Sequence, residues 1–445
     1  MLRKNKIVLL LKRYVVLITG VVCAMSCGKN ISYSYIGEGW SSNSVNTVKF
    51  RKNALTTSGK YQFVAYYDQE SYLILGKRTL HSQKWKLLKT PYKGHTKDAH
   101  NTISIAVDGD GFLHVSWDHH NTSLKYTKSK QPYSLELEEE MSMTGIQEDK
   151  ITYPEFYNLP NGNLLFFYRS GQSGRGNLVI NTYDLNHKKW TQLQNNLIDG
   201  ENKRSAYWQA CVDAKGVVHI SWVWRETWDV ETNHDVCYTQ SEDGGKTWKK
   251  SSGEKYNLPI TQASAEYAWR IPQKKNLINQ TAMTVDKYGN PYIVTYWNEN
   301  KIPQYQIVYL EDDSWKKINT GFRKTAFTLG GGGTKKIPIS RPDILIDDSK
   351  KYTSIHILFR DLERQNKVSM ASTILNKTQR WEIKDLSETS VGEWEPNYDT
   401  ALWNSRKKLH LFTQKVTQID GEGVASKNAS EVRVLQIKNL NQYQN

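Results

Sequence analysis

The sequence predicts an all-β fold, a seven-bladed β-propeller whose blades are four-stranded antiparallel sheets. Three observations support this prediction. Apolar and polar residues alternate along many short runs, which is typical of strands. These runs recur as hairpins at a spacing of about 50–70 residues, and such repetition favours a propeller over a sandwich. After the N-terminal segment, no long stretch has the periodicity of a helix.

The repeated unit is an alternating strand, often introduced by Asp-x-x-Gly, then a turn, a second strand and a loop that ends at a tryptophan. Gly59 begins the first unit and Trp85 ends it. Seven such units follow one another, and they are the basis for predicting seven blades. The units begin at Gly59, Val107, Leu159, Val212, Val285, Ile346 and Trp403.

One turn carries a more specific motif. Residues 241–248 read SEDGGKTW and fit S-x-D-x-G-x-T-W, the Asp-box of sialidase-like propellers. Its carboxylate binds turn amides, its glycine supplies a positive φ, and its tryptophan fixes the turn to the sheet. The motif therefore indicates the fold rather than an activity. A second glycine-rich segment, residues 330–333, could cradle a ligand, but it lacks the Lys-Ser/Thr of a phosphate loop and no helix follows, so a flexible loop is the preferred prediction.

The first 27 residues have the order of an export signal: basic residues, apolar runs, then small residues. Cys27 resembles a bacterial lipoprotein cleavage site, so residues 1–27 are predicted to be a signal peptide with a lipid anchor through Cys27. Plain cleavage, or use of Cys23, is the alternative. We expect an exported protein at the bacterial cell surface, in the periplasm or secreted. Residues 28–445 are expected to form a single catalytic propeller domain.

The chain carries a formal charge of +15, and 11 % of its residues are aromatic. A basic surface favours an anionic partner, although charge can also serve solubility alone. The sequence has no basic helix, zinc-finger spacing or RNA-binding motif, so nucleic acid is not the expected partner. We expect a monomer that binds an acidic polysaccharide.

Four of the eleven histidines lie between positions 100 and 120. His114 lies inside the alternating run FLHVSW and is predicted to be a strand residue. His100 comes just before a predicted strand, in DAHN, while His119 and His120 come just after one, in WDHHN. Because strand ends and loops build the site on one face of a propeller, these histidines are candidates for a common site.

The next unit adds Tyr153 and Arg169, the latter at the end of the apolar strand LLFFYR. A buried guanidinium needs an anion, which is either a ligand or a neighbouring carboxylate such as Glu155. His, Tyr and Arg around an anion suit β-elimination on a uronic acid. Arginine stabilises the enolate-like transition state, while Tyr or His removes the C5 proton and another group protonates the leaving oxygen. Hydrolysis would call for paired carboxylates.

Three stretches resemble the BNR-repeat proteins that include the propeller-type ulvan lyases, polysaccharide lyase families 24 and 25, with motif spacing most similar to family 25. These stretches are DAHNTISIAVDGDGFLHVSWDHHNTSLKY (98–126), YPEFYNLPNGNLLFFYRSG (153–171) and HISWVWRET…NHDVCYTQSEDGGKTW (219–248). The resemblance implies a seven-bladed propeller with a deep crevice. It also implies cleavage of ulvan, or a similar polysaccharide, at a uronic acid next to sulfated rhamnose.

The resemblance also assigns roles to four residues. Tyr153 and His100 would share the acid and base work, while Arg169 and His120 would hold and neutralise the carboxylate. The doubled histidine leaves open whether His119 or His120 is the working residue, and His120 is preferred because it directly precedes an asparagine, as His100 does. No cofactor is expected for catalysis.

Six further residues are predicted to bind substrate. Aromatic rings among them could stack on sugars and Arg270 could meet a sulfate, although such residues can also serve only to pack a blade. The six are His119, Asn101, Asn121, Tyr207, Trp208 and Arg270.

Cys211, His219, His234 and Cys237 form a candidate structural zinc site, because His234 and Cys237 have a ligand-like His-x₂-Cys spacing. The resemblance to lyases with a structural metal supports this reading. The alternatives are two separate histidines with two thiols, or one disulfide between Cys211 and Cys237, which export permits.

Three other functions stay open. A rhamnose–glucuronate lyase acting on arabinogalactan would use the same chemistry. A sialidase-like hydrolase would need an arginine triad, for which the candidates are Arg225, Arg270, Arg341 and Arg360. A non-catalytic propeller could capture anionic glycans. Only a lyase gives an unsaturated, ultraviolet-absorbing uronate.

Overall fold

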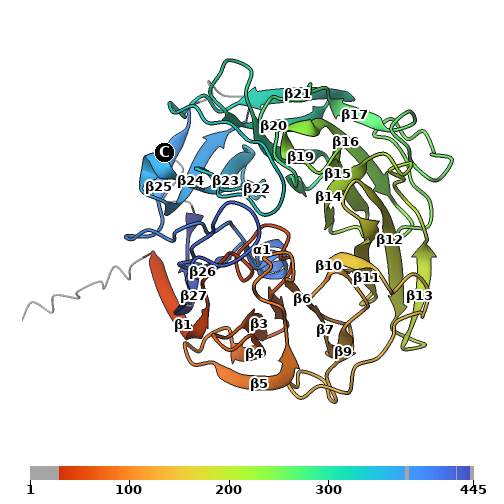
Figure 1. Cartoon of the computed structure of the whole chain (residues 1–445), viewed down its shortest axis with the longest axis vertical. Coiled ribbons are helices and arrows are strands. Elements are labelled where there is room, and N and C mark those ends of the chain that lie inside the picture. The colour runs from red at the N-terminus through yellow and green to blue at the C-terminus, as the bar shows by residue number, and fades with distance from the viewer. Residues whose placement is uncertain (1–29, 376–379, 427, 441–445) are drawn as a thin grey trace, which may run out of the picture.

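Seven antiparallel sheets follow one another around a central axis in the computed structural model, which describes residues 30–375, 380–426 and 428–440 (Figure 1). The predicted seven-bladed β-propeller is therefore confirmed. The predicted signal peptide and its Cys27 lie outside the described residues. Within those residues, no helix is both long and apolar enough to cross a membrane.

The first three blades come from the N-terminal half of the chain. Blade 1 contains β2 (Leu55–Ser58), β3 (Tyr61–Tyr67), β4 (Tyr72–Thr79) and β5 (Lys86–Lys93). Blade 2 contains β6 (Ile103–Val107), β7 (Leu113–Trp117) and β9 (Tyr126–Lys128). Blade 3 contains β8 (His120–Thr122), β10 (Ile151–Asn158), β11 (Leu164–Gln172), β12 (Arg175–Asp184) and β13 (Lys189–Gln194).

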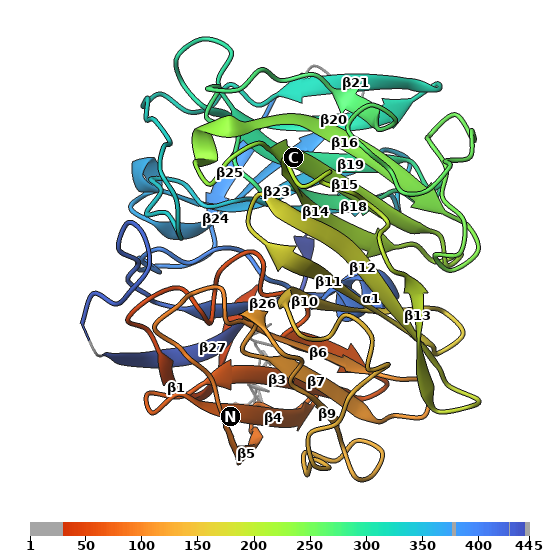
Figure 2. The same cartoon turned by 45° about the vertical axis from the view of Figure 1, so that its right-hand side comes forward.

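The next three blades each have four strands. Blade 4 contains β14 (Ser205–Val212), β15 (Val218–Arg225), β16 (Asn233–Ser241) and β17 (Glu266–Trp269). Blade 5 contains β18 (Ala282–Val285), β19 (Pro291–Trp297), β20 (Gln304–Glu311) and β21 (Ser314–Asn319). Blade 6 contains β22 (Asp343–Asp347), β23 (Ser354–Asp361), β24 (Lys367–Ile374) and β25 (Glu382–Asp385). Figure 2 shows blades 3 and 4 side by side, in yellow and green.

Blade 7 joins the two ends of the described chain. It contains β26 (Leu409–Gln414), β27 (Ala429–Ile437) and the first strand, β1 (Ile31–Trp40). Strands β1 and β27 pair antiparallel, with Ile31 opposite Ile437, so hydrogen bonds close the ring (Figure 1). Single bridges, Tyr398–Leu411 and Ser129–Leu137, extend the two three-stranded sheets. The short helices are η1 (Val230–Thr232), η2 (Leu362–Arg364) and α1 (Thr400–Arg406).

The turns follow the sequence motifs. In the Asp-box, the Asp243 carboxylate accepts hydrogen bonds from the backbone amides of Lys246 and Thr247, at 3.0 and 2.9 Å. Gly245 has a φ of 96°, and the Trp248 side chain is buried against the blade. Side-chain acceptors of this kind stabilise tight turns between strands. The Asp-box therefore has the geometry that the motif predicts.

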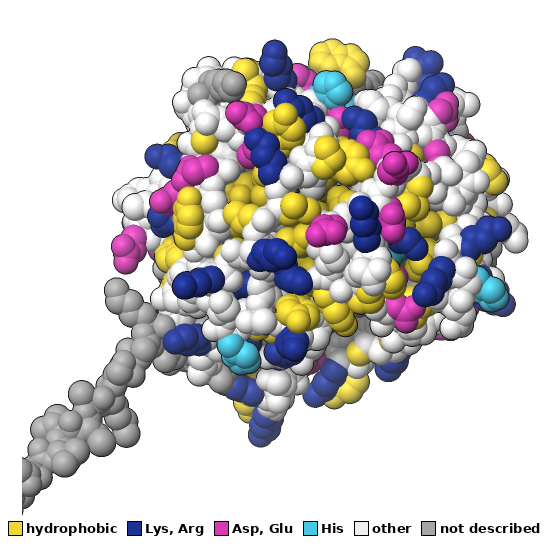
Figure 3. All heavy atoms as spheres, turned by 90° about the horizontal axis from the view of Figure 1, so that it is seen from below, with side chains coloured by type: hydrophobic (Ala, Val, Ile, Leu, Met, Phe, Trp, Pro, Cys, Tyr) yellow, Lys and Arg dark blue, Asp and Glu magenta, His cyan; other side chains and the backbone are white. Residues whose placement is uncertain are grey.

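Buried aromatic and aliphatic side chains pack the blades against one another. The largest cluster joins blades 3, 4 and 5 and includes Trp208, Trp222 and Trp224, all of which are fully buried. On the side of the molecule seen in Figure 3, lysine and arginine side chains are interspersed with acidic ones. The positive charge is therefore not gathered into one patch on that side.

Candidate active site

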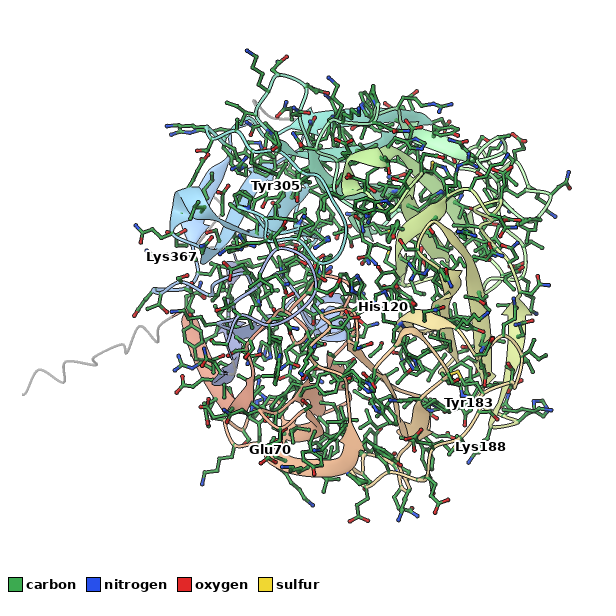
Figure 4. The ribbon with its side chains drawn as sticks, viewed as in Figure 1. Glu70, His120, Tyr183, Lys188, Tyr305 and Lys367 are labelled. Carbon is green, nitrogen blue, oxygen red and sulfur yellow. The ribbon has the colours of Figure 1, made fainter. Side chains whose placement is uncertain are left out.

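A pocket of about 310 Å³ lies where the inner strands of the blades begin. Six of its lining residues lie in, or shortly before, β2, β6, β10, β14, β18 and β22, one strand from each of six blades; they are Phe50, His100, Tyr153, Tyr207, Asn279 and Arg341. The radial arrangement of the blades thus brings together side chains that are far apart in the sequence. Figure 4 shows His120 near the centre of the ring, whereas Glu70 and Lys188 lie at its outer edge.

The four predicted catalytic residues, His100, His120, Tyr153 and Arg169, all line this pocket. The rings of His100 and His120 stack with their centroids 4.2 Å apart, and the Tyr153 ring lies 6.0 Å from His100. The Arg169 guanidinium carbon lies 5.0 Å from the centre of the Tyr153 ring. The sequence motifs therefore identify groups that the fold assembles in one place.

Asp98 joins the two histidines. Its Oδ1 accepts a hydrogen bond from His100 Nδ1 at 2.8 Å, and its Oδ2 accepts one from His120 Nδ1 at 2.5 Å. A hydrogen bond at one ring nitrogen fixes the tautomer, so Nε2 of each ring is left for other partners. The sequence analysis missed this residue, although Asp-x-His placed it two residues before His100.

Glu422 reaches the same histidine from blade 7. It lies in the loop between β26 and β27, and its Oε1 is 3.2 Å from His100 Nδ1. Burial lowers the pKa of His100, but hydrogen bonds to Asp98 and Glu422 outweigh it and raise the pKa to about 9. Burial raises the pKa of Asp98, but the bonds from both histidines hold that pKa well below its usual range. His100 is therefore an imidazolium at neutral pH.

Tyr153 points into the pocket from an irregular strand. Its φ is 59°, and the pairing of β10 with β11 shifts register between Thr152 and Glu155. Such bulges redirect a side chain out of the regular alternation and are common near active sites. The bulge places the Tyr153 ring 6.0 Å from the Tyr207 ring of the next blade.

These two tyrosines lie among guanidinium groups, which affect them differently. Burial raises the pKa of Tyr153, and the effect of nearby arginines only partly opposes it. Burial also raises the pKa of Tyr207, but Arg225 and then Arg169 outweigh it, so the pKa of Tyr207 lies below its ordinary value. Of the two, Tyr207 is therefore the tyrosine whose surroundings favour the phenolate form.

Arg169 is buried in the pocket wall. Its Nη2 donates to Thr152 Oγ1 at 3.2 Å, its Nε has no partner, and among the described residues no carboxylate forms an ion pair with it. Glu155, the suggested partner, instead accepts bonds from Tyr157 Oη at 2.5 Å and Trp208 Nε1 at 3.1 Å. A buried, unpaired guanidinium calls for an anionic ligand.

Of the six predicted substrate-binding residues, only Tyr207 lines the pocket. His119 is fully buried and contacts Thr122 and Lys125; burial lowers its pKa to about 4, despite an opposing backbone hydrogen bond. Of the doubled histidine, His120 is therefore the one that lines the pocket. The exposed side chain of Asn121 is not among the lining residues.

The other three predicted residues serve local packing. Asn101 donates to the His95 carbonyl at 3.0 Å, and Trp208 is buried, donating to Glu155. Arg270 lies outside the pocket, 3.2 Å from the centre of the Tyr267 ring and 3.1 Å from the Asp235 carboxylate. None of the three lines the pocket, so their predicted role in substrate binding stays a prediction.

The four candidates for the arginine triad of a sialidase-like hydrolase do not all gather in the pocket. Arg270 and Arg360 do not line the pocket, and Arg341, which does, is paired with Glu395 at 3.0 Å. Arg225 lines the pocket without an ion pair among the described residues. The site therefore offers two unpaired guanidiniums, those of Arg169 and Arg225.

The predicted zinc ligands are also not brought together. His219 Nδ1 bonds Tyr238 Oη at 2.7 Å, and His234 lies near the opposite end of the blade, where it bonds Glu226 at 2.8 Å. Cys211 and Cys237 are free thiols, so the alternative disulfide is absent as well. The antiparallel register explains the difference, because it pairs Cys211 with His219 but Cys237 with Trp222.

Among the described residues, three potential ligand atoms come within 4.8 Å of one another only at Asp98, His100 and His120. The hydrogen bonds that Asp98 accepts from His100 and His120 already explain why these ligand atoms lie so close together.

Sequence reasoning missed several residues of the pocket wall as site residues. They are Phe50, Ser173, Trp228, Val230, Asn279, Gly332, Gly333, Thr334, Lys335 and Glu422. Most of them lie in loops that carry no motif. The exception is the glycine run, for which a flexible loop was preferred to a ligand cradle; Gly332 and Gly333 line the pocket.

Comparison with known proteins is consistent with this architecture. A family model described as BNR repeat-containing family member matches residues 61–323. The chain is 28 % identical over 138 residues to the short isoform of an ulvan lyase from Alteromonas sp. (strain LOR), covering 28 % of this chain and 26 % of that protein. It is 23 % identical over 245 residues to an ulvan lyase from Nonlabens ulvanivorans, covering 46 % and 49 %. The alignments thus span less than half of each relative.

Solved structures share the fold over most of the chain. The polysaccharide lyase Uly1 superposes with a TM-score of 0.65 at 15 % identity, covering 91 % of this chain and 100 % of that one. A PL25 ulvan lyase bound to -[GlcA(1-4)Rha3S]- superposes with a TM-score of 0.64 at 13 % identity, covering 89 % and 98 %. At this level of identity the likeness concerns the fold.

Proposed function

This chain belongs to the BNR repeat-containing family, and we propose that it is a polysaccharide lyase that cleaves ulvan, or a similar uronate-containing polysaccharide, by β-elimination. One observation carries the proposal. Arg169, a buried guanidinium that pairs with no carboxylate of the described residues, lies in one pocket with two histidines and two tyrosines. A cation for the substrate carboxylate, with groups that can take and give protons, is what β-elimination on a uronic acid requires.

The proposed reaction begins with the uronate carboxylate on Arg169, with His120 as its second donor. Charge on the carboxylate then grows as the C5 proton leaves, and the fixed guanidinium stabilises it. We assign the base role to Tyr153 and Tyr207 together: nearby arginines lower the pKa of Tyr207, and at Tyr153 they partly oppose the rise that burial causes. The electron pair forms the C4=C5 double bond as the C4–O bond breaks.

His100 completes the reaction as the acid. Its pKa of about 9 keeps it protonated at neutral pH, so it can give a proton to the leaving glycosidic oxygen. The products are a new non-reducing end that carries an unsaturated uronate and a new reducing end on the other fragment. No water is consumed, which separates this reaction from hydrolysis.

The direct test is to incubate the purified chain with ulvan, arabinogalactan, heparin-type glycans and pectin, following ultraviolet absorbance. We expect absorbance to rise with ulvan, and a rise with arabinogalactan instead would redirect the substrate to that glycan. The control is Arg169→Met, which removes the cation with little change in side-chain length. Release of reducing ends without the chromophore would overturn the proposal in favour of a hydrolase.

We also propose that the protein is exported and anchored by a lipid on Cys27, since its substrate is a large extracellular polymer. Labelling cells with an alkyne-tagged fatty acid tests this. The wild-type protein should take up label and the Cys27→Ala variant should not. If neither protein takes up label, the proposed lipid anchor is wrong and the signal peptide is removed by plain cleavage.

A further inference from the structure

An exposed tryptophan stands at the rim of the pocket. Trp228 lines it, yet its side chain is 67 % exposed, and it is the only tryptophan among the large exposed apolar side chains of the described residues. The other large rings nearby are buried; Tyr153 and Tyr207 are 4 % and 2 % exposed. An indole held in water beside a ligand pocket is a candidate contact for the ligand.

The backbone around Trp228 is held in place from two sides. Arg225 donates from Nε to the Thr227 carbonyl at 3.1 Å and from Nη2 to the Trp228 carbonyl. The Asp229 carboxylate accepts from the Gly331 amide at 2.8 Å, and the Val230 amide donates to the Gly331 carbonyl at 2.9 Å. The ring of Trp228 is therefore exposed, but it lies on a loop whose backbone is fixed by hydrogen bonds.

The glycine run explains how the ring is seated. A Cβ atom at Gly332 would lie 2.8 Å from Cε3 of Trp228, closer than side chains tolerate, and 3.4 Å from its Cζ3. The indole therefore packs directly on the backbone of Gly332, and a side chain there would displace it. The glycine run thus has a function beyond flexibility, because its small size makes room for the ring.

We infer that Trp228 is a stacking platform for the sugar ring next to the uronate that reacts. The inference rests on the proposed function. Trp228 and the catalytic groups line one pocket, and Arg225 links them, because its guanidinium bonds the Trp228 carbonyl and lies 5.5 Å from the centre of the Tyr207 ring. A pyranose presents an apolar C–H face, which packs against aromatic rings. A 6-deoxy sugar such as rhamnose adds a methyl group to that contact.

Steady-state kinetics with ulvan tests the platform. Trp228→Ala should raise KM about three- to tenfold with a smaller change in kcat, and Trp228→Phe should recover most of the loss. Gly332→Ala should act in the same direction by displacing the indole. The matched control is Tyr288→Ala, which removes a ring that is 70 % exposed in a turn outside the pocket, and it should leave KM unchanged.

Chemical modification gives a readout that does not depend on turnover. N-Bromosuccinimide should oxidise Trp228 first, and ulvan hexasaccharide should protect it while neutral dextran should not. Unchanged KM in Trp228→Ala, or oxidation that the hexasaccharide does not slow, overturns the inference. A wild-type protein without lyase activity overturns the proposed function instead, and the protection experiment still decides whether a sugar covers Trp228.

Discussion

His100 and His120 stack face to face with 4.2 Å between their ring centroids, and both donate from Nδ1 to the one carboxylate of Asp98. Two imidazole rings at this distance could not both carry a positive charge without a nearby anion. The shared carboxylate sets both ring orientations at once and leaves both Nε2 atoms for other partners. Three of the predictions below depend on this arrangement.

Replacing Asp98 by asparagine should lower kcat on the order of 10²-fold, because an amide cannot accept charge-assisted bonds from both rings. If Asp98 served only to stabilise the fold, replacing it would not shift the pH profile of kcat. Loss of the carboxylate should instead move the alkaline limb of kcat to lower pH, since the pKa of His100 falls. Asp98→Glu, which keeps the charge, should recover part of the activity. If the alkaline limb of kcat does not shift in Asp98→Asn, the inference that Asp98 supports the charge of His100 is contradicted.

Activity should decline as the pH rises through about 9, where His100 loses its proton and can no longer protonate the leaving oxygen. The measurement is kcat between pH 6 and 10 on the substrate that yields the chromophore. Glu422→Gln weakens the support for the imidazolium, so its alkaline limb should appear at lower pH than in the wild type. Identical limbs in both proteins would argue against His100 as the acid.

Tyr153→Phe and Tyr207→Phe should each lower kcat by about 10²-fold or more, because the two phenols share one proton-accepting role. The double variant should lose little beyond the more damaging single change, as expected for groups that act as a unit. Circular dichroism of each variant checks that the fold is kept. Full activity of Tyr207→Phe would assign the base to Tyr153 alone.

Folding stability should depend on pH through His100. The pKa of this histidine is raised in the folded state, so its contribution is fully present below about pH 6.5 and is lost as the pH rises through about 9. The loss should be on the order of 1–3 kcal/mol in the free energy of unfolding, because the side chain is only 12 % exposed. Urea unfolding at pH 6.5 and 9.5 measures it. His100→Gln should flatten this dependence, and an equal slope in both proteins would contradict the assignment.

The fold could be predicted well from the sequence because the same pattern recurs from one blade to the next. Each hairpin shows the same alternation, and the Asp-box turn at Asp243 has the geometry that its motif implies. The four residues predicted to be catalytic could be found because each lies next to a strand end within a recognisable motif. Their positions in the pocket agree with the prediction, and their roles stay predictions.

What the sequence could not predict depends on contacts between distant blades. Glu422 reaches His100 from the last blade, and no local pattern marks it. The predicted zinc ligands lie apart for a related reason, because spacing along the chain does not show where a strand reverses. His234 and Cys237 are close in sequence, yet they face Trp224 and Trp222 in different surroundings.

The closure of the ring has a consequence for how the site is assembled. The loop that brings Glu422 to His100 belongs to the blade in which β1 pairs with β27, at the two ends of the described chain. A chain whose first six blades are folded but whose last blade is still open would have most of its β-structure. Glu422 would not yet lie beside His100, the proposed acid. The proposed lyase activity would then be the last property gained during folding and the first lost when β1 and β27 separate.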